Sequence, residues 1–193
     1  MGEPATKLAT AGDLARLPES AAAEVVAGVI VYKAVPTFDH GLAQGNIGES
    51  LGSFKRRPRG GGPGGWWIVP EVEVEYEPHE VYRHDLVGWR RDRVPERPAD
   101  WPVHARPDWA CEVLSPSNWA NDTVKKFATL QRHGGPHYWL VDLDRRVLTV
   151  FRLVSGLYAV ATHAEPGERK RLEPFDALEL EVAVLFGDDP ADQ

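Results

Sequence analysis

Three charged side chains within largely apolar runs are the residues of this chain that could do chemistry. Glu112 lies in DWACEVL, Asp85 lies in VYRHDLVGW, and Lys126 follows Glu112 in the next segment. A carboxylate among apolar residues is costly to bury unless a cation pairs with it or a ligand binds it. Two carboxylates on strands and a lysine on the following helix suit metal-dependent hydrolysis of a phosphodiester bond. In that chemistry the carboxylates hold Mg²⁺, a cation that prefers oxygen ligands, and the lysine orients water or offsets charge on phosphorus.

Asp108 competes with Asp85 as the partner of Glu112, because Pro107-Asp108 precedes Glu112 in a compact motif. Four residues along a strand separate two α-carbons by about 13 Å, which is too far for one ion. Neighbouring strands lie about 4.8 Å apart, so Asp85 can approach Glu112 from the side. We therefore prefer Asp85 and assign Asp108 to the entry of the strand.

The choice of lysine stays open from spacing alone. Lys126 follows Asp122 by one helical turn, so the two can pair or approach one site together, although spacing favours an ordinary solvated salt bridge. Lys125 and Lys126 both lie off the side of the helix that we expect to be apolar. That side comprises Val124, Phe127, Ala128 and Gln131.

The elements that must position these side chains alternate between helices and strands. The patterns predict a hairpin around Ala27-Gly28 and three strands in WWIVPEVEVEYE, VYRHDLVGW and DWACEVL. We expect Glu71, Glu73 and Glu75 of the first of these strands to face water. Helices are predicted at Ala11 to Leu17, Thr37 to Phe54 and Asn121 to His133. A meander follows at Tyr138 to Val141, Val147 to Leu153 and Leu157 to Ala161, and one more apolar segment at Leu178 to Phe186.

Two loops carry much of the positive charge. KRRPRGGGPGG, residues 55–65, is the densest basic stretch and is either a solvated linker, the slightly favoured interpretation, or a phosphate-contacting loop. Residues 90–107 hold four prolines and many charges. A loop of that length in a compact domain is often functional or faces a partner.

Composition limits the class of protein. The 193 residues fit one domain, which we place at residues 10–186, between a disordered N-terminus at 1–9 and an acidic tail at 187–193. The net charge of −7 excludes a basic field over the whole surface, so a polyanion must be met locally. A single cysteine excludes internal disulfides, and no signal peptide or membrane span is evident. We expect a cytoplasmic protein that does not bind membranes.

Four stretches together resemble a known family. GPGGWWIVPEVEVEY, VYRHDLVGWRRDRVP, RPDWACEVLSPSNWANDTVKK and GPHYWLVD are similar to the Uma family of restriction-endonuclease-like proteins, within the PD-(D/E)XK nuclease superfamily. The resemblance runs from about Thr10 to Leu185. It implies an α/β (α+β) fold with an αβββαβ core, a mixed sheet flanked by helices, an added N-terminal hairpin and a C-terminal β meander.

The resemblance also implies roles for residues. Asp85 matches the metal-binding aspartate of the family and Glu112 its motif glutamate. The usual lysine position two residues after the glutamate holds Leu114, but a lysine four residues after an aspartate on the next helix substitutes in this family. Asp122 and Lys126 match that spacing, which decides for Lys126.

Two further positions match supporting residues of the family. Glu24 matches a glutamate near the start of its first strand, and His40 a histidine at the start of its first long helix.

Three positions depart from the family pattern. His84 replaces the proline before the aspartate, and because adjacent strand residues face opposite ways we expect it to stay outside the metal site. Ala27 stands where an acidic residue is usual in the hairpin. Leu130 stands where a tyrosine usually follows the lysine by one turn. None of the three removes an expected metal ligand.

These observations predict an endonuclease that depends on Mg²⁺ or Mn²⁺ and hydrolyses phosphodiester bonds, with DNA as the expected substrate and the choice between DNA and RNA left open by the sequence. The resemblance implies Asp85 and Glu112 as metal ligands and Lys126 as the third catalytic group. The alternative is a catalytically silent module that keeps the nuclease fold for binding or assembly, and a third possibility is hydrolysis of another phosphate-containing substrate. A homodimer is compatible with cutting two strands.

Overall fold

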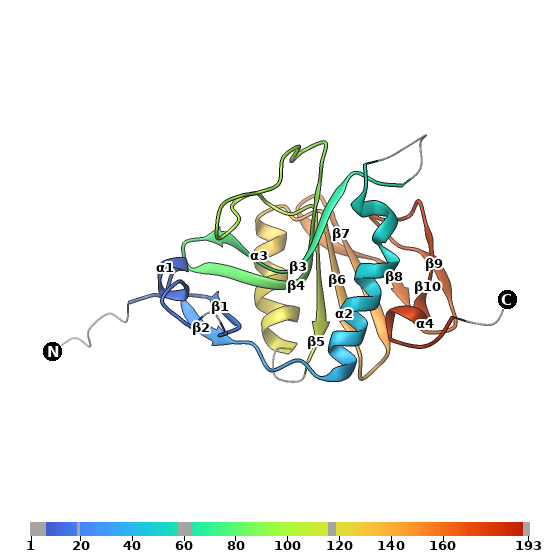
Figure 1. Ribbon diagram of the computed structural model, residues 1–193, viewed down its shortest axis with the longest axis horizontal. Coiled ribbons are helices and arrows are strands. Elements are labelled where there is room, and N and C mark those ends of the chain that lie inside the picture. Colours follow the sequence, from blue (N-terminus) through green and yellow to red (C-terminus); the bar gives the residue numbers. More distant parts are fainter. Residues whose placement is uncertain (1–6, 19, 58–62, 116–118, 191–193) are drawn as a thin grey trace.

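The computed structural model describes residues 7–18, 20–57, 63–115 and 119–190. Its centre is a large mixed β-sheet with helices packed against both faces (Figure 1). Three predicted segments fall partly outside the described residues, namely the disordered N-terminus, the basic loop and the acidic tail. None of the helices in the described ranges is long and apolar enough to cross a membrane.

The sheet follows the strand order β2-β1-β4-β5-β6-β7-β8, and β3 pairs with the other edge of β4. Its strands are β1 Ala23–Val26, β2 Val29–Tyr32, β3 Trp66–Glu77, β4 Glu80–Arg90, β5 Trp109–Leu114, β6 His137–Asp142, β7 Val147–Val154 and β8 Leu157–Ala164. β5 and β6 are parallel, and the other strand pairs of this sheet are antiparallel. A second small sheet pairs β9 Arg169–Arg171 with β10 Glu179–Glu181.

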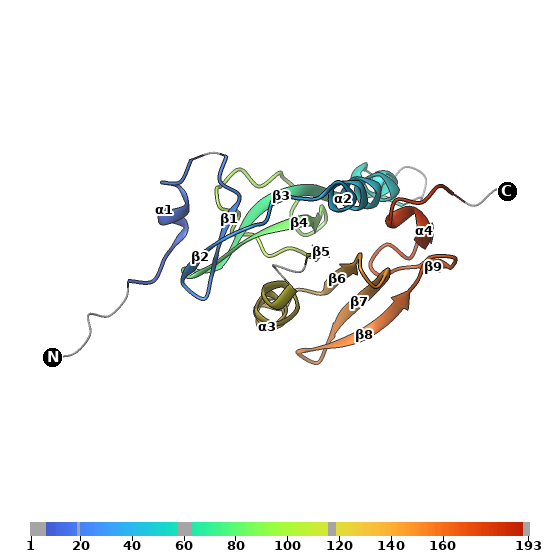
Figure 2. The same ribbon diagram turned by 90° about the horizontal axis from the view of Figure 1, so that it is seen from below.

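Helices occupy both faces of the sheet (Figure 2). They are α1 Ala11–Leu14, α2 Phe38–Ser50 with the 3-10 turn η1 Gly52–Lys55, the π-helix η2 Asn121–Lys126 continued by α3 Phe127–Arg132, and α4 Val182–Leu185. α2, β3, β4, β5, α3 and β6 follow one another as the predicted αβββαβ core, and the β1–β2 hairpin and the β7–β8 meander are added at its ends. The predicted fold is therefore confirmed.

Local sequence explains the turns that set this order. Ala27 and Gly28 have φ of 51° and 74°, the left-handed pair that a two-residue hairpin turn requires. β5 and β6 are parallel, so a crossover must join them, and η2 with α3 supplies it. The N-terminal helix is shorter than predicted and ends at Leu14, with turns completing the segment to Arg16.

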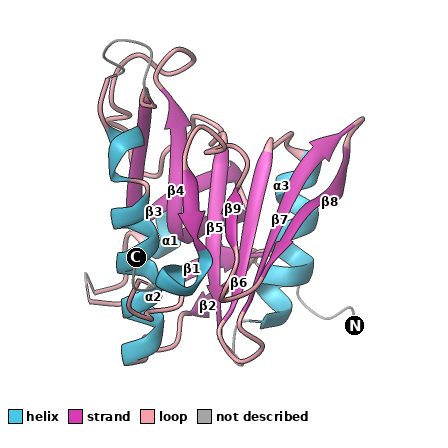
Figure 3. Cartoon of the chain, turned by 90° about the vertical axis from the view of Figure 1, so that its right-hand side faces the viewer, coloured by secondary structure: helices cyan, strands magenta, loops and turns pink. Residues whose placement is uncertain are grey.

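Each face of the sheet carries its own apolar core. Helices α2 and α3 lie on opposite sides of the sheet (Figure 3). On the α2 side, Ile47 packs in one cluster with Trp109, Trp139 and Phe175. On the α3 side, Leu130 packs in a second cluster with tyrosines of β3, β4 and β6. The two cores clamp β5 from both sides, which holds Glu112 in a fixed position.

Candidate active site

Two strands, β1 and β5, pair with the same edge of β4 at different positions along it, and the candidate site lies between them. β4 pairs with β5 from Leu86 to Gly88 and with β1 at Val81. Along the intervening stretch the side chains of Glu24, Asp85 and Glu112 approach from three different strands. The separation of β1 and β5 therefore makes room for charged groups within the sheet.

The side-chain alternation of β4 shifts within this same stretch. Tyr82 and Val87 belong to one core cluster, although an uninterrupted strand would place them on opposite faces. On the neighbouring β3, Glu71 lies between the pairs Pro70–Leu86 and Val72–His84 and has a φ of 54°. A positive φ is costly for a residue with a side chain, so the surrounding structure must hold Glu71 in place.

Lys126 is the centre of the buried charges. Its Nζ lies 2.7 Å from Glu24 Oε1, 3.0 Å from Glu112 Oε1 and 3.0 Å from Asp122 Oδ1, and the side chain is fully buried. Burial alone would lower the pKa of Lys126, but these three carboxylates outweigh it and hold the pKa well above its ordinary value. Lys126 is therefore a permanent cation inside the sheet.

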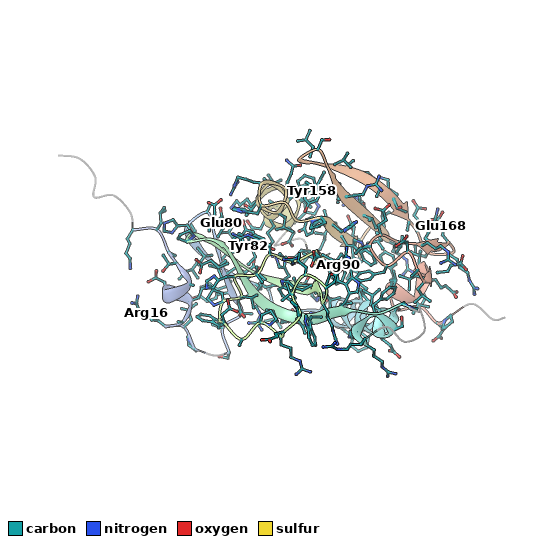
Figure 4. All side chains as sticks on the ribbon, turned by 90° about the horizontal axis from the view of Figure 1, so that it is seen from above. Arg16, Glu80, Tyr82, Arg90, Tyr158 and Glu168 are labelled. Atoms are coloured by element: carbon teal, nitrogen blue, oxygen red, sulfur yellow. The ribbon has the colours of Figure 1, made fainter. Side chains whose placement is uncertain are left out.

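The π-helix η2 presents Lys126 to the interior, and Lys125 is exposed. The predicted apolar side of this helix is wrong, because Val124 is 57% exposed whereas Asp122, Lys126 and Leu130 are buried. The buried side of this helix can carry charged side chains because they neutralise one another. A search for apolar residues at helical spacing does not detect such a side. The ring of Tyr82, from β4, lies 5.8 Å from Lys126 Nζ, and its hydroxyl donates to Glu80 beside it (Figure 4).

Glu112 has one engaged and one free carboxylate oxygen. Oε1 lies 3.0 Å from Lys126 Nζ and 2.6 Å from His84 Nδ1, whereas the buried Oε2 has no hydrogen-bond partner among the described residues. Burial raises the pKa of Glu112 to about 8, more than Lys126 lowers it. The free oxygen marks the position at which Glu112 can accept a ligand.

His84 lies closer to the site than the sequence predicted. We expected strand alternation to keep it away, but its two ring nitrogens bridge Glu112 and the hydroxyl of Tyr76, the latter at 2.9 Å. That expectation is wrong because the alternation of β4 shifts at this point. Burial, and then the charge of Lys126, lower the pKa of His84 to about 3, so the imidazole is neutral and can donate at one nitrogen and accept at the other.

Asp85 is held by groups from three elements. Its Oδ1 accepts from Lys33 Nζ at 2.6 Å, and its Oδ2 accepts the backbone N–H of Val113 at 2.7 Å and lies 3.3 Å from His40 Nε2. Burial would raise the pKa of Asp85, but His40 and Lys33 outweigh it and lower the pKa below its usual range. Asp85 is therefore ionised, and its bond to Val113 places it beside Glu112.

His40 reaches Asp85 from the first turn of α2. The side chain of Thr37 caps this helix by accepting the backbone N–H of His40 at 3.2 Å. The hydrogen bond to Asp85, more than the opposing burial, raises the pKa of His40. All six predicted site residues thus meet in one region, where Glu24 and Lys126 lie in the protein interior and His40, Asp85, Glu112 and Asp122 line a cavity.

Sequence reasoning missed two residues of this region, Lys33 and Glu71. Lys33 directly follows the apolar hairpin, and a single lysine at the end of such an apolar run could have marked it as a candidate site residue. Glu71, predicted to face water, is instead partly buried, with its carboxylate 2.8 Å from Arg83 Nε and 3.0 Å from Gln44 Nε2. Its alternation with valines suggested an ordinary half-exposed strand, which could not reveal the positive φ.

A cavity of about 780 Å³ opens at this end of the sheet. Its walls include the charged residues Lys33, His40, Glu71, Asp85, Glu112 and Asp122. Within the described ranges no group of three or more His, Cys, Asp or Glu side chains is placed to hold a metal ion. Mg²⁺ is, however, usually held in proteins by one or two carboxylates together with waters and substrate phosphates. Asp85 and the free Oε2 of Glu112 fit an ion bound in that way.

Asp108 lies away from this cavity, at the start of β5. Its carboxylate accepts the backbone N–H of Arg90 at 2.8 Å and two hydrogen bonds from the guanidinium of Arg93, each 2.8 Å. These contacts fasten the long loop to the strand. The structure thus places Asp108 at the strand entry and Asp85 beside Glu112.

A family model described as "Putative restriction endonuclease", Uma2, matches residues 11–184. The chain belongs to the Uma2 family. This confirms the resemblance and supports a nuclease role. A search of the curated proteins found no match.

One solved structure shares the fold of this chain. One of four matching chains is a crystal structure described as a "putative nuclease belonging to DUF820" from Anabaena variabilis. It is 24% identical, covers 92% of this chain and 97% of that chain, and has a TM-score of 0.71. At 24% identity this likeness shows the fold alone. The roles proposed for the site residues of this chain rest on the geometry described above.

Proposed function

We propose that the chain is a metal-dependent endonuclease that hydrolyses phosphodiester bonds in DNA. The observation that carries this proposal is the approach of Asp85 and Glu112 to one cavity, beside the buried cation Lys126. Membership of a family described as restriction endonucleases supports the reaction class. Asp85 and Glu112 are the proposed ligands of Mg²⁺ or Mn²⁺.

The residues of the chain prepare this site before substrate arrives. A divalent ion bound by the two carboxylates would polarise the scissile phosphate and lower the pKa of a bound water. The N–H of Val113 orients Asp85, and His84 and Lys126 orient Glu112 so that Oε2 faces a ligand. Lys126 offsets negative charge at the reaction centre, and Glu24 and Asp122 hold it there.

Positive charge near the cavity favours an anionic substrate. Lys33 and His40 line its wall, and the pKa of each is raised by neighbouring carboxylates, which for Lys33 outweigh the opposing effect of burial. At the far end of α2, arginines gather around Trp67, which suits contacts to a phosphate backbone in spite of the net charge of −7. We further propose that the chain forms a homodimer. We also propose that it lies in the cytoplasm, because one buried free cysteine suits a reducing compartment.

Cleavage of supercoiled plasmid DNA in Mn²⁺ tests the proposal. We expect Asp85→Ala and Glu112→Ala to reduce the rate by at least about 100-fold, because each removes an oxygen that holds the ion. Asp108→Ala is the matched control, because it removes the same carboxylate at the opposite end of the sheet and should leave cleavage intact. Either site variant cutting as fast as the parent would refute the assignment.

A catalytically silent module is the alternative that one observation favours. Both proposed metal ligands already have a lysine partner, Lys33 on Asp85 and Lys126 on Glu112. Calorimetric titration with Mn²⁺ separates the two functions. A nuclease binds the ion at a site that Glu112→Gln abolishes, whereas a pure module shows no such binding.

A further inference from the structure

Lys33 is held against Asp85 by a set of oxygens that no predicted role explains. It directly follows β2, and its backbone N–H donates to Ala22 O at 2.8 Å, which fixes the start of the side chain. Its Nζ lies 2.6 Å from Asp85 Oδ1, 2.9 Å from Arg83 O and 3.9 Å from Glu71 Oε2. With a side chain only 10% exposed, the ammonium group is lodged in the wall of the cavity.

The two proposed metal ligands differ in what they leave open. Glu112 keeps Oε2 without a hydrogen-bond partner among the described residues. Asp85 has both oxygens engaged, Oδ2 by Val113 and His40 and Oδ1 by Lys33. The bond to Val113 is made by the backbone of the strand and is not easily broken, whereas Lys33 is a flexible side chain. Oδ1 is therefore the oxygen that can be released.

A divalent ion that approaches Asp85 Oδ1 meets the ammonium of Lys33 in its place. Two cations cannot share one oxygen at close range without strong repulsion in a partly buried site. Glu71 offers the displaced ammonium a second carboxylate at 3.9 Å, within reach of a small side-chain rotation. The neighbouring Arg83 and Gln44 hold the carboxylate of Glu71 in position for this exchange.

We propose that Lys33 is a built-in competitor for the divalent ion at Asp85. The ion binds when the ammonium group leaves Oδ1 and turns toward Glu71, so the affinity for metal is weaker than the two carboxylates alone would give. This inference rests on the proposed metal site and assigns Lys33 a positioning role in its regulation. A lysine that served only as a structural salt bridge would leave the affinity for metal unimproved when removed.

Calorimetric titration of Lys33→Met with Mn²⁺ tests the proposal. Methionine keeps an unbranched chain of similar length without the charge. We expect Mn²⁺ to bind at least about tenfold more tightly than to the parent, which corresponds to about 1.4 kcal/mol. The unfolding temperature should also rise more on addition of Mn²⁺ in the variant, because at one concentration a ligand that binds the folded state more tightly stabilises it more.

Three variants complete the experiment. Lys33→Arg keeps the charge and should keep the weak affinity of the parent, and Lys125→Met removes an exposed lysine of the neighbouring helix and should change nothing. Adding Asp85→Asn to Lys33→Met should abolish the gain. If Lys33→Met does not fold, Lys33→Gln serves the same comparison, because its amide can still donate to Asp85.

The outcomes distinguish this inference from the proposed function. Equal or weaker binding of Mn²⁺ to the uncharged variants overturns the competitor role while the metal site stands. An absence of binding in the parent and in every variant overturns the metal dependence itself, and the inference with it. Tighter binding of Mn²⁺ to Lys33→Met than to the parent, Lys33→Arg and Lys125→Met supports both the metal site and the competitor role of Lys33.

Discussion

The two ends of the central sheet differ in how their charged side chains are placed. At the end where α2 begins and β5 finishes, the charges are buried and paired. The buried or nearly buried members of this group are Glu24, Asp85, Glu112, Asp122, Lys33 and Lys126. At the end where α2 leads into η1, about 20 Å along the helix axis, cations cluster at the surface. The same sheet thus carries a neutralised interior site and an exposed basic surface.

The exposed basic surface is built around Trp67. The guanidinium carbon of Arg91 lies 3.6 Å from the centroid of its ring and that of Arg97 lies 5.3 Å from it, beside a cavity of about 410 Å³. Burial, and then the neighbouring charges of Arg57 and Arg97, lower the pKa of Arg91. None of these three arginines forms an ion pair with a described residue, so their charges are available to a partner.

The contrast follows from the cost of burying charge. A buried ion must be paired, because its desolvation is otherwise uncompensated, whereas an exposed ion keeps its water. Substitutions at the interior site should therefore change the stability of the fold, and substitutions on the basic surface should change binding alone. The predictions below test this division, beginning with the largest effect on stability.

Lys126→Met should give the largest loss of stability. It leaves Glu24, Glu112 and Asp122 facing one another without a cation, and breaking a buried ion pair from one side costs about 3–5 kcal/mol. Unfolding in urea measures the change. Lys125→Met is the matched control, and its midpoint should stay close to that of the parent. Equal midpoints for the two variants would contradict the buried network.

Asp108→Ala should cost less, about 1–3 kcal/mol, because it removes hydrogen bonds to charged and backbone groups rather than a buried cation. The loss should arise from release of the long loop at the basic end of the sheet. Urea unfolding gives the magnitude, and plasmid cleavage in Mn²⁺ should persist. Loss of cleavage in a folded Asp108→Ala protein would make Asp108 a candidate metal ligand again.

The sequence predicted the fold well because its signals are local. The hairpin turn at Ala27-Gly28 and the alternation of helices and strands follow from patterns within short segments, whereas the resemblance to the family implied the αβββαβ core. The boundaries moved by a few residues, as in α1, which stops at Leu14. Strand periodicity also placed Asp85 and Glu112 on different strands. In the structure these two strands, β4 and β5, are neighbours.

The detailed site could not be predicted because its contacts are long-range. Lys33 and Asp85 lie 52 residues apart, and nothing local to either indicates the other. The shift in alternation at β4 depends on its two partners and on Glu71 in β3, so the position of His84 was mispredicted. Spacing could not separate Lys126 from Lys125, and the resemblance to the family made that choice, which matches the buried residue in the structure.

The stability of the metal-free protein should fall by roughly 2 kcal/mol as pH rises from about 6.5 to 8.5. Glu112 has a folded pKa of about 8, above its ordinary 4.5, so its contribution is present at low pH and is lost as pH rises through 8. The raised pKa of His40 acts in the same direction. His84, with a lowered pKa of about 3, has made its full contribution above its ordinary pKa of 6.5.

Urea unfolding in EDTA across this range measures the slope. Glu112→Gln should flatten it, because an amide carries no proton that the folded state can bind preferentially. No contribution of Glu112 to the slope, so that the parent and Glu112→Gln give the same profile, would mean that Glu112 is ionised in the folded protein and that its pairing with Lys126 outweighs burial.

Arg57→Ala and Arg97→Ala should have the smallest effect on stability and a clear effect on binding. Both side chains are exposed, Arg97 over the ring of Trp67 and Arg57 close enough to Arg91 to lower its pKa, so the unfolding midpoint should stay that of the parent. If these arginines contact phosphates, each variant should weaken binding of duplex DNA and reduce the slope of log affinity against log salt by about 1. Fluorescence anisotropy at several salt concentrations, in an Asp85→Ala background that prevents cleavage, measures both quantities. Arg16→Ala, at α1, is the control for loss of one exposed charge. An unchanged salt slope in both surface variants would show that DNA is bound elsewhere and that the basic surface serves another partner.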